Sequence, residues 1–103
     1  MKEIQHISDK IEKELDNAEC YIMDALDQKE KDPILAETSF QLANERMADV
    51  NMLHSQVVRL IEGYKKEKGE TPEHMKILYN ILHKKHIEHA AIIKGMLSLY
   101  KET

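Results

Sequence analysis

Three of the chain's six histidines lie in one short segment, residues 83–89, which reads His-Lys-Lys-His-Ile-Glu-His. Strongly apolar stretches flank this segment, and at helical spacing His86 and His89 fall on the apolar stripe that Tyr79 and Leu82 begin. Imidazole nitrogens are common ligands of transition metals. The middle of this predicted helix is therefore either exposed to water or binds something.

Two more polar side chains interrupt apolar stripes elsewhere, Glu14 in the first predicted helix and His54 in the second. With a rise of ~1.5 Å per residue, antiparallel pairing places them within about one or two turns of His86 and His89 along the bundle. One carboxylate and three imidazoles in a layer predict a site for iron, zinc or manganese, and no catalytic residue is predicted. The alternative is a polar layer in which Glu14 and a protonated histidine offset each other's charge. Equal rise fixes the height of a side chain and not its direction, so both interpretations stay open.

The longest apolar seam of the chain predicts a central helix over residues 33–68. Its members recur at spacings of four and three, with His54 as the interruption, and a second row of leucines widens the stripe enough to contact neighbours on two sides. The seam consists of Ala36, Phe40, Ala43, Met47, Val50, Val57, Ile61 and Tyr64. A similar stripe predicts a helix over residues 3–29, with Ile4, Ile7, Ile11, Glu14, Ala18, Tyr21 and Ala25 in line and Leu15, Ile22 and Leu26 beside it.

Residues typical of helix ends and turns separate the predicted helices, and the third helix is predicted over residues 72–101. Asp32 can cap the central helix, and Pro33 suits its first turn. Gly69 ends that helix, and Thr71 with Pro72 repeats the cap-and-proline start. Links this short force antiparallel neighbours, so we expect one all-α domain over residues 1–103, an up-down-up bundle of three long helices.

Composition narrows the classes of function. A net charge of −4 gives no basic surface for nucleic acid. No apolar run approaches the ~18 residues of a membrane span, and the N-terminus lacks the apolar core of a signal peptide, so we expect a cytoplasmic protein that contacts no membrane. The single Cys20 cannot form an internal disulfide. Wide apolar stripes on a small bundle leave apolar surface uncovered, which favours a homo-oligomer.

Residues 14–21 resemble the opening helix of ferritin-like and rubrerythrin-like proteins, in which a ligand Glu precedes a Tyr with six residues between. Residues 40–54 resemble that family's second helix. The family binds two metal ions, usually iron, through carboxylates and two Glu-x-x-His pairs in four helices. This chain has three helices and offers Met47 and Val50, or Arg46 and Asp49, in place of one pair, and His86-x-x-His89 in place of the other. The resemblance implies a ferritin-like bundle with a lost or rebuilt metal site.

Three antiparallel helices with histidines midway along the third are also similar to the lactose-type IIA subunits of the sugar phosphotransferase system. Those subunits pass a phosphoryl group through a histidine and assemble as trimers. In this chain the phosphoryl-carrying histidine would fall near Leu82 or His83, and Lys85 stands where that family has a metal-binding Asp. This resemblance implies a phosphohistidine carrier.

The leading expectation is a non-catalytic helical protein that acts through oligomerisation or through contact with a protein partner. The alternatives are a metal-binding ferritin-like protein and a phosphohistidine carrier.

Overall fold

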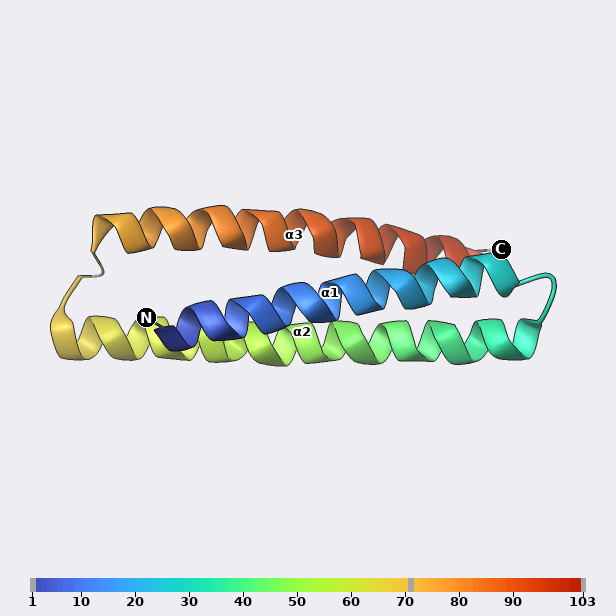
Figure 1. Ribbon diagram of the computed structural model, residues 1–103, viewed down its shortest axis with the longest axis horizontal. Helices are drawn as coiled ribbons and strands as arrows, with labels where there is room; N and C mark the ends of the chain where they lie inside the picture. Colours follow the sequence, from blue (N-terminus) through green and yellow to red (C-terminus); the bar gives the residue numbers. More distant parts are fainter. Residues whose placement is uncertain (1, 71, 103) are drawn as a thin grey trace.

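The computed structural model describes residues 2–70 and 72–102, which form three α-helices and no strand. Helix α1 spans Lys2–Gln28, α2 spans Pro33–Lys68 and α3 spans Glu73–Glu102. Each helix begins and ends within one residue of the bounds expected from the sequence. In Figure 1, α2 runs back along α1 and α3 returns beside them, forming a rod of 55 × 18 × 17 Å. The predicted all-α bundle of three helices is confirmed.

Local chemistry sets the ends of α2 as the sequence indicates. An Oδ1 atom of Asp32 accepts a hydrogen bond from the backbone N–H of Leu35 at 3.2 Å, and Pro33 occupies the first turn. Gly69 has a φ of 81°, a region that glycine adopts without strain, and its N–H donates to the carbonyl of Lys65 at 3.0 Å. The Asp32 and Gly69 caps are therefore confirmed, whereas the predicted Thr71 cap lies outside the described residues.

The core lies mainly between α1 and α2. Four alanines with no exposed surface, Ala18 and Ala25 on α1 and Ala36 and Ala43 on α2, let the two backbones approach closely. The predicted seam of α2 is buried from Ala36 to Val57 apart from His54, which is half-buried. Close packing along this seam makes α1 and α2 an αα-hairpin that spans most of the molecule (Figure 1).

The buried face of α1 is turned relative to its predicted stripe. Leu15 and Ile22, expected beside the stripe, have no exposed surface, while Ile7, Glu14 and Tyr21 are only half-buried. The reason is that α1 has two neighbours, so side chains directed between α2 and α3 are covered from both sides. Glu14 consequently lies at the edge of the core.

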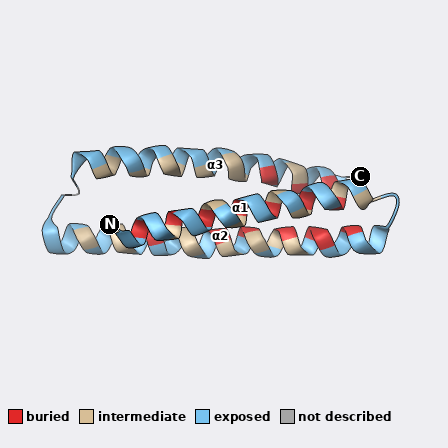
Figure 2. Cartoon of the chain, viewed as in Figure 1, coloured by how far each residue is buried: buried red, intermediate tan, exposed pale blue. Residues whose placement is uncertain are grey.

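The deepest burial of helix α3 against the hairpin is at its C-terminal end. Its buried residues are Ile93, Leu97 and Tyr100, and Figure 2 shows no buried position in its N-terminal half. The ring of Tyr100 stacks on Phe40 with 4.5 Å between centroids, and its carbonyl accepts a hydrogen bond from the ammonium group of Lys29. Toward its other end α3 stands apart from α2 (Figure 1).

The structure of the core predicts that substitution by alanine lowers the free energy of unfolding very differently at two positions of α1. Leu15 has no exposed surface, so Leu15→Ala should lower the free energy of unfolding by about 2–5 kcal/mol. The matched change Met23→Ala, at a side chain 51% exposed, should stay within about 0.5 kcal/mol of the wild type. Urea denaturation followed by circular dichroism measures both, and equal losses would contradict this description of the core.

Candidate functional site

Glu14 takes part in an ion-paired cluster between α1 and α2. The Nε atom of Arg46 lies 3.6 Å from a Glu14 carboxylate oxygen, and Arg46 Nη2 lies 3.3 Å from Asp49 Oδ2. Partial burial, together with the proximity of Asp49, raises the pKa of Glu14 above its ordinary value, and the charge of Arg46 opposes that rise. The guanidinium group thus supplies a positive charge between two carboxylates.

His54 meets a histidine that the sequence analysis did not select. Its Nε2 atom lies 3.3 Å from Nδ1 of His83, with ring centroids 4.9 Å apart, and Tyr79 stacks on His83 at 5.4 Å. Burial and the neighbouring His83 lower the pKa of His54, which favours the neutral imidazole. Equal rise per residue had placed His54 within about one or two turns of His86, and His83 lies one turn before His86, so the same signal covers His83.

His86 and His89 belong to the contact between α3 and α1. The Nε2 atom of His86 is buried without a hydrogen-bond partner, and burial lowers the pKa of this histidine. His89 Nε2 lies 3.6 Å from a carboxylate oxygen of Glu19. One helical turn before His89, Lys85 donates to Glu12 at 2.8 Å. These polar contacts hold the middle of α3 beside α1.

The structure therefore divides the four predicted ligands among separate contacts. Glu14 faces Arg46, His54 faces His83, and His89 faces Glu19, while His86 Nε2 is buried without a hydrogen-bond partner. Within residues 2–70 and 72–102, no three His, Cys, Asp or Glu side chains are grouped closely enough to hold a metal ion. The predicted ligand set is not assembled, and metal binding stays a prediction.

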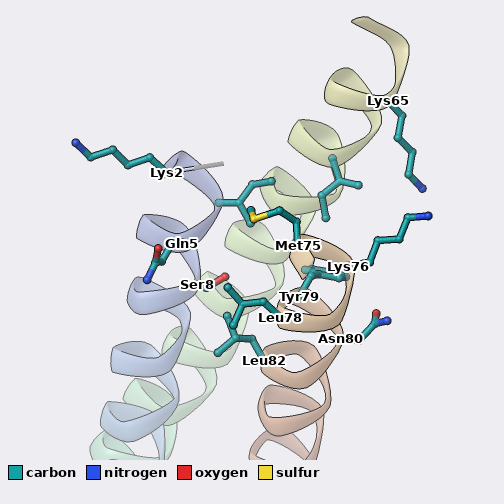
Figure 3. A pocket seen from close by; sticks show the side chains of 12 residues that line it. Lys2, Gln5, Ser8, Lys65, Met75, Lys76, Leu78, Tyr79, Asn80 and Leu82 are labelled. Carbon is teal, nitrogen blue, oxygen red and sulfur yellow. The ribbon is translucent and has the colours of Figure 1, made fainter. Parts of the chain in front are cut away.

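The separation of α3 from the hairpin leaves an apolar cleft of about 570 Å³. Apolar side chains from all three helices line it: Ile4 of α1, Ile61 of α2, and Met75, Leu78, Tyr79 and Leu82 of α3. Figure 3 shows the four side chains of α3. Three lysines stand at its rim with their ammonium groups directed away from it: Lys2, Lys65 and Lys76 (Figure 3). Lys76 Nζ lies 3.6 Å from a carboxylate oxygen of Glu70, which offsets part of the positive charge of the rim. An apolar wall beside the remaining lysines suits an amphipathic, negatively charged ligand.

A second uncovered surface lies on the side of α3 opposite its buried face. We call it the outer stripe, and its residues are Ile77, Ile81, Lys84, Glu88, Ile92, Gly95 and Leu99. All seven are exposed and recur at spacings of four and three, which aligns them along one face of the helix. Its four large apolar side chains are 49–60% exposed. Single exposed apolar residues are ordinary, whereas a row of them along one helix face is apolar surface that a contact with another helix would bury.

His86 gives the contact between α1 and α3 a pH dependence. Its pKa in the folded chain lies below the ordinary 6.5, because burial outweighs the attraction of Glu12 and adds to the repulsion by Lys85, His83 and His89. The unfolded chain therefore binds the proton more readily, and stability that is present above pH 6.5 is lost as the pH falls toward the folded-state pKa. His86→Leu should reduce the fall in Tm between pH 7.5 and pH 5.

Calorimetric scans across this range measure the effect, with His74→Leu as the control because His74 is exposed at the start of α3. An unchanged pH dependence in the His86 variant, or an equal change in the His74 variant, would remove His86 as a cause.

Comparison with known proteins adds no relative. No protein-family model, curated protein or solved structure matches this chain significantly. The resemblances to ferritin-like proteins and to lactose-type IIA subunits thus stay predictions. Among the described residues, no helix combines the length and the apolar character that crossing a membrane requires.

Proposed function

We propose that the protein is a non-catalytic helical protein that acts through helix-to-helix contact, and that its first partner is a second copy of itself. The observation that carries this proposal is the outer stripe of α3. It is apolar toward both ends and carries one lysine and one glutamate, Lys84 and Glu88, in its middle. The outer stripe of one copy is therefore complementary to the outer stripe of a second copy that runs in the opposite direction.

An antiparallel pair of α3 helices satisfies this complementarity. With a two-fold axis level with residue 86, Lys84 of each copy faces Glu88 of the other. In the same register Ile77 lies level with Gly95, and Ile81 lies level with Ala91, one residue from Ile92 of the outer stripe. A Cβ atom added at Gly95 would meet nothing within 4 Å, so this position offers open space for an isoleucine side chain.

The two kinds of contact have different roles in the proposed dimer. Burial of apolar surface contributes roughly 25 cal/mol per Å² and supplies most of the association free energy. The Lys84–Glu88 pairs contribute at most about 1 kcal/mol each, since they lie near the solvent, but they select the antiparallel register. Variants with altered charges therefore test the antiparallel register of the dimer, and variants with altered apolar residues test whether the outer stripe forms the contact.

Charge reversal provides the experiment. Lys84→Glu alone and Glu88→Lys alone each place like charges opposite one another twice, so each should shift the molar mass in solution toward the monomer. The double variant restores opposite charges and should recover the dimer, and an equimolar mixture of the two single variants should form a heterodimer. Light scattering coupled to gel filtration over a range of concentrations measures all four.

Lys94→Glu is the matched control, because Lys94 is exposed on α3 but lies outside the outer stripe. It should keep the wild-type mass, and Ile81→Glu should give a monomer at every concentration. A monomeric wild type, or a dimer that neither single charge reversal weakens, would overturn the proposal.

The apolar cleft favours a second, distinct contact. We infer that it takes an amphipathic helix of another protein whose acidic residues flank its apolar side, since three lysines stand at the rim. The cleft is formed by α1, α2 and the inner face of α3, so this contact leaves the outer stripe free.

The anionic, apolar dye anilinonaphthalene sulfonate is a direct probe of the cleft. It should fluoresce strongly with the wild type and lose most of that signal with Leu82→Asp, and added salt should weaken its binding by screening the lysines. Ile34→Asp is the control, because Ile34 is 83% exposed and lies on α2 outside the cleft. Equal signals from the two variants would exclude the cleft as the binding surface.

A further inference from the structure

We propose that His54 and His83 bind one transition-metal ion of the kind that prefers imidazole, such as Zn²⁺, Ni²⁺ or Cu²⁺, and that this ion bridges α2 and α3. The site differs from the four-residue set expected from the sequence, since His83 was not among those residues. It is also independent of self-association, because both histidines lie away from the outer stripe.

The spacing of the two nitrogens fits a shared ion. Two imidazole nitrogens bound to zinc at ~2.0–2.1 Å with a tetrahedral angle lie about 3.3 Å apart. The distance between His54 Nε2 and His83 Nδ1 is 3.3 Å. The second torsion of a histidine side chain is soft, so small rotations of the rings can direct both lone pairs at one point between the helices.

The surroundings favour a metal over protons at this pair. Both rings must be neutral to act as ligands, and the partial burial of His54 disfavours its charged form. The nitrogen that donates in the hydrogen bond gives its proton up when the ion binds, and the other nitrogen of that ring takes one from solvent. The net proton count of the two neutral rings is unchanged.

The ligand types indicate which ions the site selects. Two imidazoles without a carboxylate suit first-row transition-metal ions such as Zn²⁺, Ni²⁺ and Cu²⁺. Mg²⁺ and Ca²⁺ prefer oxygen ligands, which this pair does not provide. Water would complete the coordination, since within the described residues no third His, Cys, Asp or Glu joins the pair. Stacking of Tyr79 on His83 limits the directions that the ring can take.

The proposed ion would tie α3 to α2 where the two helices otherwise stand apart. The buried anchor of α3 begins at Ile93, ten residues beyond His83. Tyr79 also lines the apolar cleft, so an ion at this pair would fix one wall of the cleft. Metal binding should therefore stabilise the N-terminal half of α3 more than the hairpin.

The experiment is a titration of untagged, metal-free protein with Zn²⁺ and with Cu²⁺, followed by calorimetry and by the shift in Tm. The wild type should take up one equivalent per chain, with Cu²⁺ bound more tightly than Zn²⁺ and no response to Mg²⁺. His54→Ala and His83→Ala should each weaken binding by more than about tenfold. The double variant should bind no worse than either single variant, because one remaining imidazole cannot chelate.

His74→Ala and His89→Ala serve as matched controls and should bind as the wild type does. Lys84→Glu, the variant designed to disrupt the dimer, should also keep the metal, which separates this test from that of self-association. Absence of binding by the wild type would overturn the proposal and leave the pair as a hydrogen bond between helices. Binding that survives the loss of both His54 and His83, or that is lost with His89, would place the ion elsewhere.

Discussion

The close approach of α1 and α2 determines what the rest of the molecule can do. Alanines without exposed surface bring the two backbones together along the hairpin, and the large side chains Leu15 and Ile22 fill the space beside them. Most of the buried apolar surface is used within this hairpin. The buried residues of helix α3 are Ile93, Leu97 and Tyr100. Its remaining length is held by the partly buried Tyr79, Ala90 and Met96 and by polar contacts that are individually weak.

The apolar cleft, the histidine pair and the outer stripe all exist because α3 is deeply buried only near its C-terminal end. The N-terminal half of α3 stands away from the hairpin and leaves the apolar cleft open, and the histidine pair lies between that half and α2. The outer stripe remains uncovered because the hairpin occupies only one side of α3 (Figure 2). A fully packed bundle of three helices would have closed the cleft and buried the histidines among apolar residues. Incomplete packing is thus a condition for each of the proposed contacts.

The sequence predicted the elements of this fold well because their causes are local. The seam from Ala36 to Val57 repeats at helical spacing, and Asp32 and Gly69 carry the side-chain and backbone chemistry of helix ends. The fold class and the bounds of the helices followed from these signals. None of them depends on how one helix is rotated against another.

The candidate site depended on that rotation and was predicted only in part. Equal rise per residue placed Glu14 and His54 at similar heights, but α1 is turned so that Glu14 faces Arg46 while His54 faces His83. A turn of about 100° per residue means that a neighbour one position away points in another direction. His83 was not in the predicted ligand set, although it lies three residues before His86 on the same helix.

The anchor of α3 also bears on the order in which the molecule is completed during synthesis. The hairpin of α1 and α2 can form as soon as residue 68 has left the ribosome, since its contacts join neighbouring parts of the chain. Tyr100, which covers Phe40 and accepts a hydrogen bond from Lys29, emerges more than thirty residues later. Until then the side of the hairpin that Tyr100 covers stays exposed to water in the nascent chain.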